Sequence, residues 1–401
     1  MTATPAAGSP LDDVRGASRL AIDLTMLMTD AVETMHHDVA RGRGPLGRPI
    51  AAPATGLTGF VYRRVRGVTR LVGRAVDAVL APLGPCVPGT ADWPGRDALL
   101  GAINGVLGDH LEATDNPLQI RMQLRMNGHA VDGGPDEPVT PAPRRRIVVV
   151  VHGLCMTDAC WSRGGHDHGR RLARDLDAEL IHVRYNSGRH ISTNGAQLAQ
   201  RLDAMVRRWP EPPQITLVGH SMGGLVVRSA CAEADAAAHD WVRRVNAIVF
   251  IGTPHHGAPL ERHGHGVDRL FAASPYTVAF TRLAHLRSAG ITDLRHGSTR
   301  DADWQGRDRF GADGDVCRPP PLPAHIAAFV IAGSLGKRRA ASPRGDGLVP
   351  VASAFGEWIG HSGVAPANGY IAYETGHLDL LASASVYAQM RRWLIPRRAM
   401  P

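Results

Sequence analysis

The chain has 401 residues, of which 44% are hydrophobic and 20% are charged, as in an ordinary globular protein. Its formal net charge of +8 comes almost entirely from arginine, and no nucleic-acid recognition motif accompanies it. No apolar run reaches the ~18 residues of a membrane span, and the first residues lack the pattern of a secretory signal. Five cysteines at irregular spacing favour a reducing compartment. We therefore expect a cytoplasmic protein that does not bind nucleic acid.

Residues 1–115 are expected to form a helical N-terminal extension. Apolar residues recur at helical spacing over residues 18–40, 57–80 and 96–111, and Gly- and Pro-rich breaks separate these stretches. The helix at 57–80 has one stripe of valines and one of arginines. The arginines are Arg63, Arg66, Arg70 and Arg74. Either its valines pack on the rest of the protein, or the helix lies on an anionic membrane surface as a peripheral contact. The small size of valine argues against deep insertion.

Residues 116–401 are expected to form a second domain with a parallel sheet. Alternating apolar residues from Leu118 to Met126 lead into Asn127-Gly128, which predicts a β-hairpin. The run Ile147–Val151 is typical of a buried central strand, and strands and helices alternate after it, which predicts a doubly wound sheet. Further strands are expected at 180–184, 215–218, 247–251, 327–332 and 370–373, and helices at 194–208, 223–234 and 383–394. The long irregular stretch 256–312 is expected to be a lid.

The motif Gly219-His220-Ser221-Met222-Gly223 is the strongest indication of chemistry. It lies between a predicted strand and a predicted helix, where a sharp turn exposes the serine hydroxyl to a neighbouring base. Side chains at Gly219 and Gly223 would clash where the helix meets the strand. Because the strand and the helix both flank the motif, we interpret Ser221 as a nucleophile.

A nucleophilic serine of this kind needs a base and an acid later in the chain. His377 follows the last predicted strand, where a loop can reach back over the nucleophile. Asp346 lies before it in a loop flanked by glycines, and its carboxylate would hold the imidazole tautomer. Other acids stay open as alternatives, namely Asp313, Asp315 and Asp379.

An oxyanion hole requires two backbone amides. One is expected from Met222, the residue after the nucleophile. The other is expected from the loop His152–Cys155 after the valine-rich strand, with Leu154 as the first candidate and Cys155 as the next. Cys155 is itself expected to be a small loop residue, since no adjacent histidine would activate its thiol.

These motifs together resemble the serine lipase and esterase branch of the α/β-hydrolases, and more narrowly bacterial triacylglycerol lipases and GPI inositol-deacylase-like proteins. The resemblance covers about residues 145–395 and includes Gly252-Thr-Pro-His-His-Gly257. The segment Tyr185–Arg189 is similar to a loop of the deacylase-like group. The resemblance implies an α/β-hydrolase fold, ester hydrolysis, and the roles given above to Ser221, Asp346 and His377. The expected architecture is this fold with a helical extension and a lid.

A metal site is not expected. Four histidines lie close together at the beginning of the predicted lid, with His255 just before it and His256, His263 and His265 inside it. They lack a sustained ligand spacing and a nearby thiolate, so a histidine-rich loop is favoured. The resemblance to bacterial lipases implies that Asp379 could help bind calcium. However, Ser383 stands where those lipases offer a further side-chain ligand, and this departure counts against the site.

The sequence thus predicts a serine carboxylic-ester hydrolase that forms an acyl-enzyme and needs no cofactor. Its expected partner is a small-molecule or lipid ester with an apolar acyl group. Two other functions stay open. One is a non-catalytic lipid- or membrane-binding protein that retains the fold, and the other is an acyltransferase that uses the same three residues.

Overall fold

The computed structural model describes residues 9–40, 56–82, 93–131, 145–209, 211–257, 287–308, 317, 319–338, 345–356 and 368–395. Its contacts divide the chain into two compact units. The first includes the N-terminal helices and Val106–Gln119, and the second includes Asp97–Gly105 and most of the chain from Ile120 onward. The predicted domain division into residues 1–115 and 116–401 stays a prediction.

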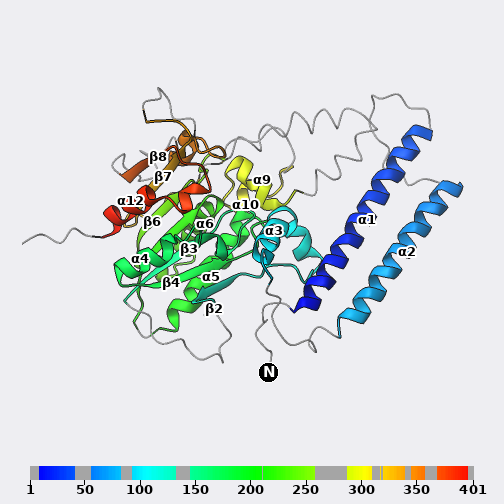
Figure 1. Ribbon diagram of the computed structural model, residues 1–401, viewed down its shortest axis with the longest axis horizontal. Helices are drawn as coiled ribbons and strands as arrows, with labels where there is room; N and C mark the ends of the chain where they lie inside the picture. Colours follow the sequence, from blue (N-terminus) through cyan, green and yellow to red (C-terminus); the bar gives the residue numbers. More distant parts are fainter. Residues whose placement is uncertain are drawn as a thin grey trace, which may run out of the picture. The chain divides into compact units, whose positions relative to one another are not determined.

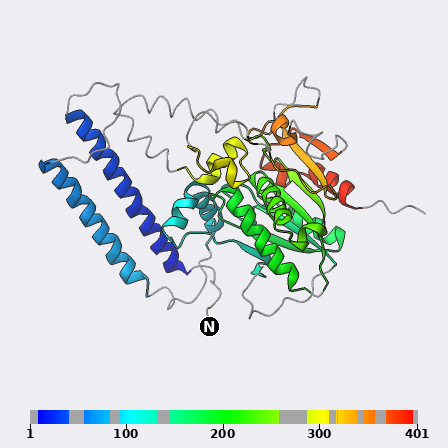
Figure 2. The ribbon, with the colours of Figure 1, turned by 180° about the vertical axis from the view of Figure 1, so that it is seen from behind.

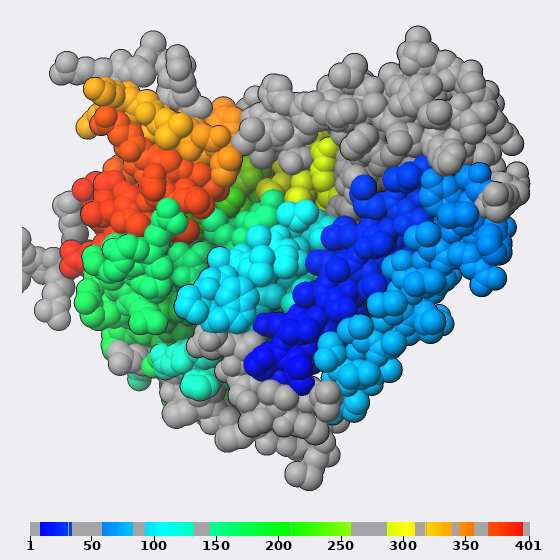
Figure 3. Space-filling view, turned by 45° about the vertical axis from the view of Figure 1, so that its right-hand side comes forward, coloured from blue at the N-terminus to red at the C-terminus, as the bar shows by residue number. Residues whose placement is uncertain are grey.

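In the first unit, α1 (Pro10–Ala40) and α2 (Gly56–Leu80) lie side by side along their length (Figures 1 and 3). The contact between them is rich in ion pairs. Asp77 of α2 accepts hydrogen bonds from Arg15 at 2.5 Å and from Arg19 at 2.7 Å. Arg66 of α2 pairs with Asp30 and Glu33 of α1. The helices predicted from the periodicity at 18–40 and 57–80 are therefore confirmed.

The apolar stripe of α2 is largely exposed. Five of its larger apolar residues are between 43% and 68% exposed, namely Val61, Val65, Val68, Leu71 and Val72. Within the described residues, none of the helices has the length and apolarity that crossing a bilayer requires.

The predicted helix at 96–111 is α3 (Arg96–Ala113), which is kinked at Leu107, where φ is −124°. The predicted hairpin follows it as β1 (Gln123–Met126) and β2 (His129–Ala130), which pair antiparallel. Asn127 and Gly128 have φ values of 51° and 86°, the left-handed conformation that a two-residue hairpin turn requires.

The second unit contains an eight-stranded sheet in the order β2-β1-β4-β3-β5-β6-β7-β8 (Figure 1). β1 pairs antiparallel with β4, whereas the neighbours from β4 to β8 pair in parallel. The parallel strands are β3 (Arg146–Val151), β4 (Glu179–Arg184), β5 (Gln214–His220), β6 (Val245–Ile251), β7 (Ala327–Ser334) and β8 (Gly369–Tyr373). The strands predicted from residue 147 onward are therefore confirmed to within a few residues, whereas the alternating stretch from Leu118 forms a strand only over Gln123–Met126.

Helices cover both faces of the sheet (Figures 1 and 2). α5 (Ile191–Arg207) and α6 (Met222–Ala236) pack on one face, and α4 (His168–Leu176) and α12 (Ala384–Leu394) on the other. The valines of β3 alternate between these two cores, with Val149 in one and Val150 in the other. The sequence predicted three of these helices and missed α4, which presents only Leu172, Ala173 and Leu176 as buried apolar residues.

The predicted lid at 256–312 falls largely outside the described residues, since 258–286 and 309–316 are not among them. Residues 287–308 contain two short helices, α9 (Ala289–His296) and α10 (Asp301–Trp304). A lid over the site therefore stays a prediction.

The close packing of α5 on α6 gives a test of the fold. At Gly195 of α5 a Cβ atom would overlap the hydroxyl of Ser229 on α6. Gly195→Ala should therefore lower the free energy of unfolding by about 1–3 kcal/mol. The matched control is Gly67→Ala on α2, where a Cβ meets nothing within 4 Å, and it should be neutral or stabilise by up to about 1 kcal/mol. Urea unfolding measures both, and equal changes would contradict the packing described.

Candidate active site

Ser221 lies in the turn between β5 and α6, with φ 54° and ψ −128°. A positive φ is unfavourable for a residue with a side chain, and such strain persists only where the surroundings impose it. The Ser221 amide donates to the Ile251 carbonyl at 2.8 Å, which ties the turn to the end of β6. The predicted strand, turn and helix around Ser221 are therefore confirmed.

Glycines allow α6 to approach the sheet at this turn. A Cβ at Gly223 would overlap the carbonyl oxygens of Val151 and His152 at the end of β3. A Cβ at Gly219 would lie 2.5 Å from the Cα of Gly224. Any side chain at either position would push the start of α6 away from the strands, so both glycines are needed for the turn.

Asp346 and His377 form a close buried pair. His377 Nδ1 lies 2.7 Å from Asp346 Oδ2, and the two residues are 5% and 3% exposed. The other carboxylate oxygen accepts the amides of Val349 at 2.7 Å and Leu348 at 3.0 Å. The loop around Asp346 depends on Gly345 and Gly347, whose φ values are 90° and 98°. These contacts fix the carboxylate from both sides and orient the imidazole through its Nδ1.

The structure brings His377 to the same turn as Ser221. A Cβ at Gly252, the residue after β6, would lie 3.2 Å from Cε1 and Nδ1 of the His377 ring. His220 donates from Nε2 to the His377 carbonyl at 3.2 Å, and the two rings have their centroids 4.8 Å apart. Burial, reinforced by the neighbouring His377, holds the pKa of His220 well below its ordinary value. His220 is therefore a neutral donor that anchors the His377 loop beside Ser221.

The loop after β3 lies directly against Ser221. A Cβ at Gly153 would lie 2.9 Å from the Ser221 Cβ. Two residues later, Cys155 has φ 59° and donates its amide to the Ser187 hydroxyl at 3.1 Å. The Cys155 amide is thus already engaged, whereas the amides of Leu154 and Met222 donate to no other group within the described part of the chain.

Comparisons with known proteins found one family model that matches part of the chain. The family model described as PGAP1-like alpha/beta domain matches residues 174–314, which include the Ser221 turn. No curated protein matches the chain. The chain has the α/β-hydrolase fold.

Similar solved structures share little sequence with this chain. The mature Bacillus licheniformis lipase BlEst2 is 18% identical, with a TM-score of 0.42 over 66% of this chain and 97% of that one. The type II thioesterase YbtT is 16% identical, with a TM-score of 0.36 over 64% and 95%. The metagenomic carboxyl esterase MGS0156 is 15% identical, with a TM-score of 0.33 over 78% and 99%.

The structure does not place any of the alternative acids where Asp346 lies, within the described residues. Asp379 is exposed, and the His377 Nδ1 contact is made by Asp346 instead. Asp313 and Asp315 lie outside the described residues. Burial raises the pKa of the Cys155 thiol, which keeps this thiol protonated and agrees with its interpretation as a loop residue.

The histidines considered as metal ligands fall into two groups. His255 is buried beside Arg228, whose Nη1 lies 3.4 Å from the His255 Nδ1, and burial holds the pKa of His255 well below its ordinary value. The amide of the next residue, His256, donates to the Ser353 hydroxyl at 3.3 Å, and His263 and His265 lie outside the described residues. Among the residues that the structure does describe, no group of three or more His, Cys, Asp or Glu side chains has the arrangement of a metal site.

Sequence reasoning missed several residues that position this site. Ser187, which accepts the Cys155 amide, was noted only as part of a family-like loop. His168 donates from Nε2 to the Leu380 carbonyl at 2.8 Å, three residues after His377. Gly101 and Gly105 of α3 pack against Cys155 and Met156. A G-x-x-x-G spacing is visible at 101–105, but nothing in the sequence indicates which residues pack against these two glycines.

Buried histidines around the site give a prediction about acid stability. Burial lowers the pKa of His152 and His168 to about 4, whereas a histidine in the unfolded chain has a pKa of about 6.5. Between these values the unfolded chain binds protons that the folded chain excludes. Stability should therefore fall as pH drops from about 6.5 towards 4, by up to about 1.4 kcal/mol per pH unit for each histidine.

Urea unfolding at several pH values measures this slope. His168→Gln, which keeps a donor for the Leu380 carbonyl, should make the slope shallower by about one proton. The control His129→Gln, in the exposed hairpin, should leave the slope unchanged. A wild-type stability that does not change between pH 6.5 and 5 would contradict the neutral buried histidines.

Proposed function

We propose that the protein is a serine carboxylic-ester hydrolase with Ser221 as nucleophile, His377 as base, and Asp346 as the acid that orients His377. The observation that supports this most directly is the 2.7 Å contact between His377 Nδ1 and Asp346, in a loop held beside the strained Ser221 turn. The substrate class we propose is a lipid or another ester with an apolar acyl group.

The proposed reaction has two halves. With Nδ1–H bonded to Asp346, the His377 ring has its unprotonated nitrogen at Nε2, which takes the Ser221 hydroxyl proton as Oγ attacks the ester carbonyl. The amides of Leu154 and Met222 stabilise the negative charge on the carbonyl oxygen. The alcohol then leaves with the proton from His377. In the second half, water gives a proton to His377 as it attacks the acyl carbonyl, and His377 returns this proton to the Ser221 oxygen as the carboxylic acid leaves.

Substitutions at the three residues test this proposal. A fluorophosphonate probe should label the folded wild-type protein and fail to label Ser221→Ala. Asp346→Asn should keep the fold but lower kcat on a p-nitrophenyl ester by about 10³–10⁴-fold, because the amide no longer favours the correct imidazole tautomer. The matched control is Asp379→Asn, two residues after His377, which should retain activity. Wild-type protein that is folded and unlabelled would contradict the proposal.

We also propose that α2 contacts an anionic membrane surface, where the substrate of a lipid esterase would lie. Its exposed valine stripe runs from Val61 to Val79, about 27 Å at 1.5 Å per residue. The helix also carries exposed arginines that form no ion pair with any described residue, namely Arg63, Arg64, Arg70 and Arg74. An apolar stripe beside unpaired arginines is the pattern of helices that lie in a membrane interface.

Co-sedimentation with vesicles tests the membrane contact. The wild-type protein should bind vesicles of phosphatidylglycerol and phosphatidylcholine, and bind pure phosphatidylcholine much less. The triple variant Arg63→Gln/Arg70→Gln/Arg74→Gln should lose at least about tenfold in affinity, since each arginine near an anionic surface contributes roughly 1 kcal/mol. The control is the triple variant Arg170→Gln/Arg174→Gln/Arg243→Gln in the second unit. It removes the same amount of charge from arginine side chains that are 72–77% exposed. Equal losses in both triples, or no loss, would contradict a specific role for α2.

A further inference from the structure

The first part of α3 packs closely on the loop that follows β3. Gly101 and Gly105 lie one helical turn apart on the same side of this helix. A Cβ at Gly105 would overlap the Cys155 Sγ and lie 2.7 Å from the Cys155 amide nitrogen and Cα. A Cβ at Gly101 would lie 2.9 Å from the Met156 carbonyl carbon. The two glycines therefore form a groove in α3 that receives the backbone of Cys155 and Met156.

This contact bears on Leu154, whose amide is the proposed oxyanion donor. Leu154 directly precedes Cys155. It has little freedom to adjust, because the residues on both sides of it are held in place. Gly153 is packed against Ser221, and the Cys155 amide is bonded to Ser187 at 3.1 Å. Cys155 also has a positive φ of 59°, a conformation that its surroundings must maintain. A displacement of Cys155 therefore moves the Leu154 amide relative to Ser221.

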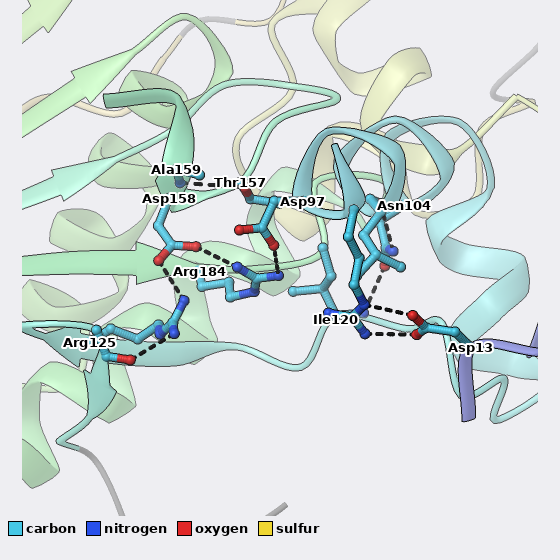
Figure 4. A network of polar contacts seen from close by, with 12 residues as sticks. Asp13, Asp97, Asn104, Ile120, Arg125, Thr157, Asp158, Ala159 and Arg184 are labelled. Atoms are coloured by element: carbon cyan, nitrogen blue, oxygen red, sulfur yellow. Dashed lines mark hydrogen bonds and ion pairs between the residues drawn. The ribbon is translucent and has the colours of Figure 1, made fainter. Parts of the chain in front are cut away.

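The first part of α3 is itself firmly attached within the second unit (Figure 4). Asp97 pairs with Arg184 at the end of β4 at 2.5 Å, and Arg184 pairs with Asp158 at 2.8 Å. Asp158 also accepts Arg125 of β1 at 2.7 Å and lies three residues after Cys155. The same carboxylate network thus holds the start of α3 and the far end of the loop.

A buried amide fixes α3 a second time, close to the groove. The Asn104 side chain is fully buried, accepts the Ile120 amide at 2.8 Å and donates to the Leu100 carbonyl at 2.9 Å. Asn104 is adjacent to Gly105. Its hydrogen bonds therefore prevent the part of α3 that touches Cys155 from sliding along the helix axis. The groove is a rigid surface against which the loop is set.

We propose that Gly101 and Gly105 are positioning residues of the oxyanion hole. They make α3 a support that sets the place of the Leu154 amide, so that this helix, which precedes the sheet in sequence, takes part in transition-state stabilisation. This inference rests on the proposed esterase function. Displacement of a donor by about 1 Å costs on the order of 10²-fold in rate, so small changes in the groove should be measurable.

The test compares Gly105→Ala and Gly101→Ala with the control Gly67→Ala on the exposed part of α2. The measurements are kcat and KM on a soluble p-nitrophenyl ester and the Ki of an alkyl trifluoromethyl ketone. This ketone forms a tetrahedral adduct with the serine whose oxyanion needs the same two amides. Gly105→Ala should lower kcat by roughly 10–100-fold with little change in KM. Its Ki should rise by a similar factor.

Gly101→Ala should show the same pattern to a smaller degree, because the Cβ meets its neighbour less closely there. Gly67→Ala should change neither constant. A purely structural role would lower the melting temperature and leave kcat and Ki unchanged when measured well below it, and that result would overturn the inference. If Gly105→Ala does not fold, Ser187→Ala replaces it. This variant removes the acceptor of the Cys155 amide without adding an atom, and it should also raise Ki and lower kcat.

The outcomes separate this inference from the function on which it rests. A wild-type protein that neither labels with fluorophosphonate nor cleaves esters would contradict the proposed function. An active wild type whose glycine variants retain full ketone affinity would contradict only the role of α3.

Discussion

The strained backbone of Ser221 depends on how closely α6 approaches the ends of β3 and β5. A φ of 54° costs a residue with a side chain on the order of 1–3 kcal/mol, and here the surrounding packing maintains it. Gly223 lies against the carbonyl oxygens at the end of β3, and Gly219 lies against α6 itself. The same approach sets the Met222 amide at the first turn of α6, next to the serine. One packing constraint thus sets both the half-buried Ser221 at the turn and the Met222 amide beside it.

The parallel sheet brings the other groups to this point. Parallel strands all end at one edge, so the loops after β3, β6, β7 and β8 meet where β5 ends. Asp346 follows β7, and His377 follows β8, which pairs with it. Neutral histidines then fix these loops, because burial favours the uncharged imidazole. His220 donates to the His377 carbonyl, and His168 donates to the Leu380 carbonyl in the same loop.

Much of this arrangement could be predicted from the sequence. Strands buried on both faces are continuous apolar runs, so Ile147–Val151 was recognisable as the central β3. The order of Ser221, Asp346 and His377 followed from local motifs with a strand before each of them. The short helix α4 was missed because its three buried apolar residues are too few to define a period. The supports of the loop were missed as well, because Ser187 and Gly105 act through neighbours that are distant in sequence.

The helix α2 shows that periodicity alone does not predict which face of a helix is buried. The pattern correctly predicted a helix, but an apolar stripe is normally expected to be the buried one. Instead, α2 turns Asp77 and Arg66 towards α1, where they are paired with Arg15, Arg19, Asp30 and Glu33, and leaves its valines exposed. The ion pairs depend on residues of another helix 33 to 62 positions away, and periodicity within α2 contains no information about them.

The most direct measurement is the mass of the protein during its first turnover. Intact-protein mass spectrometry after rapid acid quench of the wild type with a p-nitrophenyl ester should show one added acyl group. Peptide mapping should then place this group on Ser221, at the strained turn. This adduct should form and decay fast enough to account for the rate of ester cleavage. Turnover without an adduct, or an adduct on another residue such as Cys155, would contradict it.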